Sequence, residues 1–96
     1  MAKVKWLLEA LEDIERLHRF LYDKSPEAAA GAAKTILQAA TLLESSPQIG
    51  RPMQDDTGRR ELFAAYGAGA YVLRYKLVDK TPIIIRVWHS REHRIG

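Results

Sequence analysis

The chain of 96 residues has no cysteine, and this absence removes several kinds of structure and site at once. Neither a disulfide framework nor a thiolate metal site can form, and nothing in the composition indicates an oxidising compartment. No apolar run approaches the roughly 20 residues that cross a bilayer, and residues 1–5 are not followed by a signal-type apolar stretch. We therefore expect a cytoplasmic protein without membrane insertion or secretion.

Signatures of catalysis are missing as well. The sequence has no nucleophile elbow, no phosphate-binding loop and no metal-spaced histidine cluster, and its second half has no paired carboxylates. His18 lies near an apolar stripe, but no second ligand-type residue is spaced with it, so a histidine packed at the edge of the stripe is the favoured interpretation. The sequence predicts no metal and no cofactor. At this length we expect one domain over residues 1–96, built as a thin two-layer body.

Charge is unevenly divided along the chain, whose formal net charge is +3. Residues 1–50 carry 6 Lys and Arg and 7 Asp and Glu. Residues 51–96 carry 9 Lys and Arg and only 5 Asp and Glu. Seven of those nine cations are arginines, which bind carboxylates and phosphates in bidentate fashion. This pattern indicates an acidic partner, either a polypeptide or a nucleic acid.

The first half of the chain predicts a short strand and two helices. Residues 4–6 alternate between apolar and basic side chains and are expected to pair with a later sheet. From Leu7 to Leu21 the apolar residues recur at three- and four-residue steps, which indicates an amphipathic helix. Ser25 is a good cap for a second, alanine-rich helix that runs to about Glu44. Alanine lets the two helices approach closely as an antiparallel hairpin.

The second half predicts a long loop and three strands. Prolines and glycines over residues 45–58 stop the second helix and form the loop. Strands are expected at residues 60–66, 71–77 and 83–89, separated by short turns, so an antiparallel meander is the economical topology. One face of this sheet must pack on the helices.

The residues best suited to hold a charged partner gather where the last expected strand ends. They are Arg86, Trp88, His89, Arg91, His93 and Arg94. The indole can stack on bases, the arginines can hold phosphates, and His89 can act as a general acid near neutral pH. Strand parity, however, places His89 on the face of Ile85 and Val87 and opposite to Arg86 and Trp88. A binding surface and an ordinary sheet edge with a solvated tail both fit this pattern.

Several segments that are weak alone form a specific pattern through their order and spacing. They are Val4-Lys5-Trp6, Glu9-Ala10-Leu11-Glu12-Asp13-Ile14, Pro47-Gln48-Ile49-Gly50-Arg51-Pro52, Arg60-Glu61-Leu62, Tyr71-Val72-Leu73-Arg74-Tyr75 and Ile83-Ile84-Ile85-Arg86-Val87-Trp88-His89-Ser90-Arg91. Over nearly all of its length the chain resembles the RelE/ParE superfamily of bacterial type II toxins, and within it the ParE branch. The resemblance implies an α+β fold of order β-α-α-β-β-β, with a helical hairpin packed on an antiparallel sheet.

The resemblance also implies a cognate antitoxin, acidic and ParD-like, whose flexible C-terminal segment wraps the toxin. The basic second half suits such a partner, because a disordered acidic chain is attracted by charge while it buries apolar side chains. We assign Arg51, Arg60 and Arg74 to antitoxin binding.

ParE-like toxins poison DNA gyrase by holding it at the cleaved-DNA stage, and they serve in plasmid stabilisation. On this interpretation the chain is an inhibitor that acts by binding in the bacterial cytoplasm, with no catalytic residue. Its target would be held by the strand end, with direct contact to nucleic acid as an option. The target-binding residues are then Arg86, Trp88, His89, Arg91 and Arg94.

The alternative within the same superfamily is a RelE-like endoribonuclease that cuts mRNA in the ribosome. It would use His89, Arg86 and Arg91 as acid and phosphate clamps. Such toxins commonly carry an arginine after the tyrosine of the middle strand, where this chain has Val72, and a catalytic basic or aromatic residue near the C-terminus, where this chain ends without a tyrosine. Both departures weaken the nuclease hypothesis. A third hypothesis is a toxin fold that has lost toxicity and survives as a regulatory partner of the antitoxin.

Overall fold

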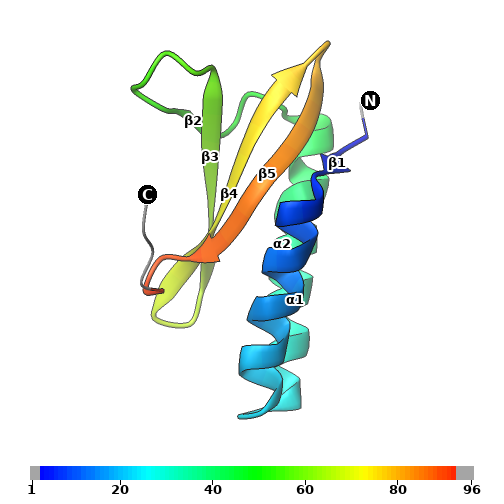
Figure 1. The fold of residues 1–96 in the computed structure, drawn as a ribbon, viewed down its shortest axis with the longest axis vertical. Coiled ribbons are helices and arrows are strands. Elements are labelled where there is room, and N and C mark those ends of the chain that lie inside the picture. Colours follow the sequence, from blue (N-terminus) through cyan, green and yellow to red (C-terminus); the bar gives the residue numbers. More distant parts are fainter. Residues whose placement is uncertain (1–2, 93–96) are drawn as a thin grey trace.

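The computed structural model describes residues 3–92, which form two helices against one face of a five-stranded sheet (Figure 1). In chain order the elements are β1 (Lys5–Trp6), α1 (Leu8–Tyr22), α2 (Pro26–Ser45), β2 (Arg51–Pro52), β3 (Arg59–Tyr66), β4 (Gly69–Val78) and β5 (Thr81–His89). The predicted α+β class and the order β-α-α-β-β-β of the main elements are confirmed. The two-residue strand β2 lies inside the stretch that was predicted as loop. Among the described residues, no helix is both long enough and apolar enough to span a bilayer.

The sheet has the strand order β1-β5-β4-β3-β2, so the last strand of the chain lies beside the first. β1 does pair with the later sheet as predicted, but it runs parallel to β5, and only the other three pairings are antiparallel. The β4–β5 turn places Asp79 and Lys80 at φ 50° and 68°, as a two-residue type I′ turn requires. The β3–β4 turn begins with Gly67 at φ 62°.

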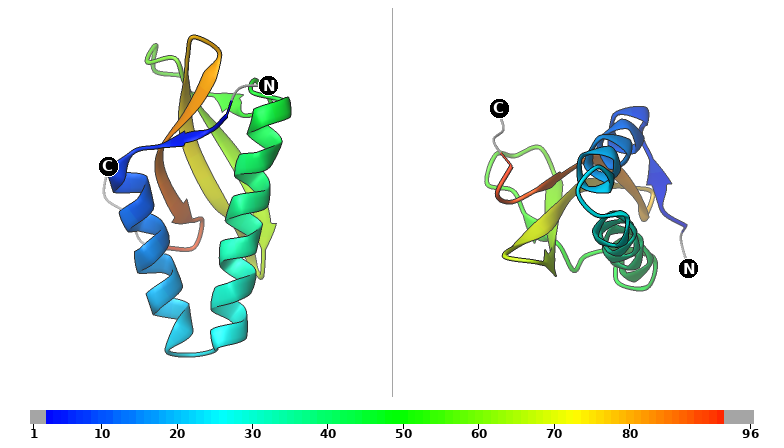
Figure 2. Two further views of the ribbon diagram at one scale, coloured as in Figure 1. Left: turned by 90° about the vertical axis from the view of Figure 1, so that its right-hand side faces the viewer. Right: turned by 90° about the horizontal axis from the view of Figure 1, so that it is seen from below.

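The helices form the predicted antiparallel hairpin and extend beyond one end of the sheet (Figures 1 and 2). The Ser25 hydroxyl accepts a hydrogen bond from the backbone N–H of Ala28 at 3.2 Å, which confirms the predicted cap of α2. Gly31 within α2 is used for close packing, because a Cβ there would lie 2.8 Å from the hydroxyl of Tyr66. That hydroxyl donates to the carbonyl of Ala28 at 2.7 Å and so ties β3 to α2.

The core lies between the helix hairpin and the facing side of β4 and β5. Its buried members are Ala10, Leu17, Ala32, Ile36, Ala39, Ala40, Leu43, Tyr71, Leu73, Tyr75, Ile84 and Val87. The predicted stripe of α1 is only partly correct: Leu17 is buried, but Leu11 is 49% exposed and Asp13 is only 4% exposed. The reason is that α1 lies against α2 and β5, so the helix turns its Ala10–Asp13–Leu17 side toward the protein.

A β-bulge in β5 overturns part of the predicted parity of the last strand: Ile84 lies on the face of Val87 and not on that of Arg86 and Trp88, whereas the predicted separation of His89 from Arg86 and Trp88 is confirmed. Arg86 pairs with Arg74, but Ile84 pairs with the next residue of β4, Tyr75, which leaves Ile85 as the extra residue. A bulge shifts every later side chain to the opposite face. Ile84 and Val87 therefore both face the core with no exposed surface, and Ile85 is only partly buried.

Candidate functional site

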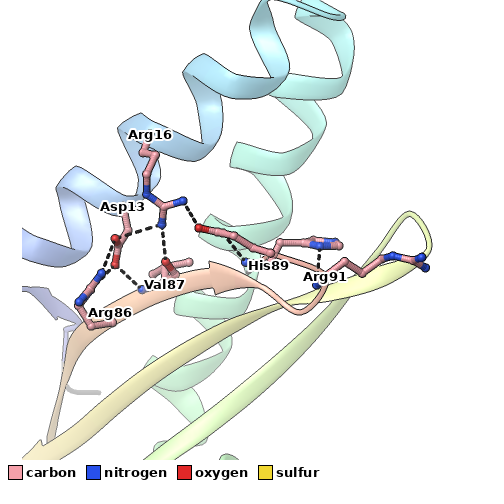
Figure 3. A network of polar contacts seen from close by, with 7 residues as sticks. Asp13, Arg16, Arg86, Val87, His89 and Arg91 are labelled. Atoms are coloured by element: carbon pink, nitrogen blue, oxygen red, sulfur yellow. Dashed lines mark hydrogen bonds and ion pairs between the residues drawn. The ribbon is translucent and has the colours of Figure 1, made fainter. Parts of the chain in front are cut away.

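Asp13 of α1 covers the open edge of β5 (Figure 3). β1 reaches only as far as Ile84, and the next edge N–H, that of Val87, donates to Oδ2 of Asp13 at 2.9 Å. The same oxygen accepts from Nε of Arg86 at 2.7 Å, and Oδ1 accepts from Nη2 of Arg86 at 3.1 Å and from Nη2 of Arg16 at 3.2 Å. Unpaired strand edges are costly when buried, and one carboxylate here satisfies the edge and binds two guanidinium groups.

The environment of Asp13 keeps its carboxylate ionised. Burial alone would raise the pKa of Asp13, but hydrogen bonds from the Arg86 side chain, the Val87 N–H and the Arg16 side chain together hold that pKa below its ordinary value. The predicted target-binding role of Arg86 therefore meets a competing contact, because its guanidinium is already held against α1.

Glu92 continues this network around the end of β5. Its carboxylate accepts from Nη1 of Arg16 and, at 3.2 Å, from the backbone N–H of His89. The chain turns back here, since the N–H of Glu92 donates to the carbonyl of His89 at 2.9 Å. The strand end is thus fastened to α1 by two carboxylates, Asp13 and Glu92.

His89 faces the helix side of the sheet and has both ring nitrogens occupied. Nδ1 accepts from the backbone N–H of Arg91 at 3.2 Å, so the ring proton lies on Nε2, which faces the carbonyl of Tyr66 at 3.3 Å. The ring also makes an edge contact with Tyr71, with centroids 4.9 Å apart. Through the hydrogen bond to the Arg91 N–H, the His89 ring fixes the turn before Arg91.

Trp88 lies on the opposite, helix-free face, where its strand partner is Val72. Arg74 lies over its indole at 4.9 Å from the ring centroid, within the range of a cation–π contact. Val72 is only 2% exposed although no helix covers this face, and its other strand partner is Phe63. The helix-free face therefore has a small apolar centre of its own, bordered by arginines.

The arginines assigned to antitoxin binding occupy three different settings. Arg51 lies over the ring of Phe63, 5.3 Å from its centroid, on the helix-free face. Arg74 donates from Nε and Nη2 to Glu61 at 3.0 and 2.8 Å. Arg60 donates to the carbonyls of Gln48 and Gly50 and so holds the loop after α2.

The predicted cluster at the strand end is thus divided between two sides of the sheet. Trp88 belongs to the helix-free face, beside Arg74, whereas His89 and the exposed Arg91 belong to the helix side. His93 and Arg94, also predicted there, lie outside the described residues. Within residues 3–92, no three His, Asp or Glu side chains lie close enough together to hold a metal ion.

A groove of about 660 Å³ lies between the second half of α1 and the tip of the β3–β4 hairpin. Leu17, Leu21, Tyr66 and Tyr71 are among its lining residues. Phe20 also lines it and is 62% exposed. Sequence reasoning missed this feature, although Phe20 falls off the apolar stripe of α1, and an aromatic residue away from the core face is a signal of an interaction surface.

Comparison with known proteins gives a consistent picture. The family model described as the ParE toxin of the type II toxin-antitoxin system parDE matches residues 4–94. Toxin RelE3 of Caulobacter vibrioides is 35% identical over 85 residues, covering 88% of this chain and 90% of the relative. Toxin RelE1 of the same organism is 33% identical over 87 residues, covering 91% of each.

Two solved structures share the fold. One is the chromosomal ParDE toxin–antitoxin system from P. aeruginosa, with a TM-score of 0.75 at 22% identity, covering 93% of this chain and 96% of the other. The other is the toxin–antitoxin complex RelBE2 from Mycobacterium tuberculosis, with a TM-score of 0.61 at 25% identity, covering 92% and 96%. The fold, the family match and the two curated relatives agree, and the chain belongs to the ParE toxin family, within the RelE/ParE superfamily of type II toxin–antitoxin toxins.

Proposed function

We propose that this toxin inhibits DNA gyrase by binding to it and stabilising the cleaved-DNA complex, and that a cognate acidic antitoxin neutralises it. The match of residues 4–94 to the ParE model supports the choice of gyrase. The two structural neighbours, both toxin–antitoxin systems, support the partner.

The observation that carries the proposal is the division of the strand end between two faces. On the helix-free face, Trp88 and Arg74 form a stacked pair, and Arg51 and Phe63 form another, so we extend the target-binding surface to two arginines that the sequence pattern assigned to the antitoxin. Aromatic rings and arginines dominate the energetics of protein interfaces. His89, the proton donor that a nuclease would need, is turned to the other face with both nitrogens engaged. The arrangement favours contact over proton transfer.

Purified toxin tests the proposal in a gyrase supercoiling assay with a parallel measurement of cleaved DNA. We expect inhibition together with accumulation of cleaved plasmid. Trp88→Ala should weaken both by about tenfold or more, which corresponds to the loss of roughly 1.4 kcal/mol of contact. Arg91→Ala should also reduce the effect, and Lys34→Ala, an exposed residue on α2, is the matched control. Circular dichroism should show that each variant is folded. Absence of inhibition by folded wild-type toxin would refute the gyrase target.

A ribosome-dependent endoribonuclease is the second candidate, because both curated relatives carry the name RelE. In that case His89, Arg86 and Arg91 would act as acid and phosphate clamps. Translating ribosomes incubated with the toxin should then yield mRNA cut at the ribosomal A site, and His89→Ala should abolish the cuts. Uncut mRNA in the presence of folded toxin would exclude this activity.

A further inference from the structure

Four exposed side chains form a stripe along the outer side of α1. They are Leu11, Glu15, His18 and Tyr22, which follow one another at steps of four, three and four residues. Such steps keep side chains within about 60° of one another around a helix axis. The helix packs on the protein with its Ala10–Asp13–Leu17 side, so the stripe is turned toward solvent.

The stripe has apolar ends and a charged middle. Leu11 is 49% exposed at one end and Tyr22 is 54% exposed at the other. The Tyr22 ring stacks on His18, with centroids 5.7 Å apart. Glu15 carries a negative charge near the centre and forms an ion pair with Arg19, and both side chains are about 70% exposed. Burial of the two large apolar ends would be favourable, so the stripe is suited to a partner surface.

The spacing of the stripe reads the same in both directions. When a second α1 lies antiparallel across the first, Leu11 of each copy meets Tyr22 of the other, and Glu15 of each copy meets His18 of the other. A parallel arrangement would place Glu15 against Glu15, and a contact between like charges is unfavourable. The charges therefore select the antiparallel order.

We propose that the outer side of α1 is a self-association surface, on which a second copy of this chain docks antiparallel with the same stripe. The two contacts between Leu11 and Tyr22 bury apolar surface. The contacts between Glu15 and His18 set the register and add little affinity, because exposed ion pairs are weak.

The expected dimer is weak and leaves the target surface open. One helix from each copy makes a small interface, so we expect a Kd of about 10–100 µM. The helices lie on one face of the sheet (Figure 2), so the helix-free face stays uncovered in both copies. The proposal therefore does not depend on which target the toxin has.

Cysteine cross-linking tests the register, because the chain has no cysteine of its own. Leu11→Cys and Tyr22→Cys chains, mixed under oxidising conditions, should give a covalent dimer that contains one copy of each. Leu11→Cys alone should not, because its two introduced thiols would lie about 16 Å apart along the helix axis, beyond the reach of a disulfide. Leu11→Cys mixed with Val78→Cys is the matched control, since Val78 is 47% exposed on β4 and outside the stripe.

Sedimentation velocity of the full chain measures the dimer itself. Wild type should show a monomer–dimer equilibrium that depends on concentration. Leu11→Glu alone and Tyr22→Arg alone should each weaken dimerisation by about tenfold or more, because each introduced charge meets an apolar side chain at both ends of the dimer. An equimolar mixture of the two variants should dimerise again, because opposite charges meet at one end and unchanged residues meet at the other. Val78→Glu should dimerise like wild type.

Several outcomes would overturn the proposal once circular dichroism has shown that the variants are folded. One is wild-type toxin that stays monomeric at high concentration. Others are a dimer that neither variant weakens, a mixture that does not recover, and cross-linking of Leu11→Cys alone as efficient as that of the mixture. If the toxin is monomeric and the protein encoded by the adjacent reading frame slows hydrogen exchange at residues 11–22, the stripe belongs to that partner and the proposal is refuted.

Discussion

Replacement of Asp13 by alanine is the sharpest test of how α1 is fastened to the sheet. The substitution removes the acceptor of the Val87 N–H and of the two arginines. We expect the variant to fold and to lose a large part of its stability, because the carboxylate is almost fully buried while the arginines are not.

The size of the stability loss in Asp13→Ala follows from what happens to each group that Asp13 binds. The Val87 N–H is left buried without its acceptor, which costs about 1–3 kcal/mol. The Arg86 and Arg16 side chains are 43% and 45% exposed, so water replaces their lost bonds and each contributes at most about 1 kcal/mol. The sum is a loss of about 3 kcal/mol in the free energy of unfolding, or a decrease in Tm of roughly 12–24 °C for a domain of this size.

Urea unfolding followed by circular dichroism, with unchanged m values, measures this loss. Glu15→Ala is the control, since Glu15 and Arg19 form an ion pair on the same helix with both side chains about 70% exposed. Its effect should stay within about 0.5 kcal/mol.

The stability that Asp13 contributes depends on pH in a direction set by its lowered pKa. The pKa of Asp13 is lowered by folding, so its contribution is present above the unfolded-state pKa of about 3.9 and is lost as pH falls through the folded pKa. The stability gap between wild type and Asp13→Ala should therefore be full at pH 7 and shrink below about pH 4. If Asp13→Ala is no more destabilising than Glu15→Ala, or if the gap is unchanged at low pH, the reasoning is refuted.

Three further substitutions test the packing of tyrosines against glycines and loop carbonyls. Gly50→Ala should destabilise the fold by about 1–3 kcal/mol in urea unfolding, because its Cβ would lie 2.5 Å from the Tyr75 ring. Tyr75→Phe should cost about 1–3 kcal/mol by the same measurement, since the Pro47 carbonyl loses its donor and the Gly50 N–H its acceptor; a neutral result would mean that water replaces the hydroxyl. Gly31→Ala should not gain the roughly 1 kcal/mol expected from helix propensity, because it displaces the Tyr66 hydroxyl, but it should gain it in a Tyr66→Ala background. Equal effects in both backgrounds would contradict this coupling.

Much of the fold could be predicted because the local signals are strong. The Ser25 cap, the alanine-rich helix and the Asp79-Lys80 turn each depend on neighbours in sequence, and all three are present. The bulge at Ile85 could not be predicted for a specific reason. Three consecutive isoleucines show no alternation, so either face suits each of them, and only pairing with β4 decides which residue is extra.

The site was harder to predict than the fold. Strand parity did predict that Trp88 and His89 lie on opposite faces, but it could not predict that the Arg86 side chain is held by Asp13 of α1. The burial of Asp13 could not be foreseen either, because its role depends on where β1 ends beside β5, and that is a tertiary feature. The groove is formed by α1 and by the tip of the β3–β4 hairpin, which are far apart in sequence, so no single segment of the sequence predicts it.

The position of β5 between β1 and β4 bears on when this fold can close during synthesis of the chain. The ribosome delivers β5 last, yet β1, α1 and β4 all depend on it. A nascent chain that lacks this strand leaves Asp13 without Arg86 and the Val87 N–H, and leaves α1 without the strand it packs on. Domains whose closing contacts join distant segments of the chain fold late, so this fold can close only after β5 has left the ribosome.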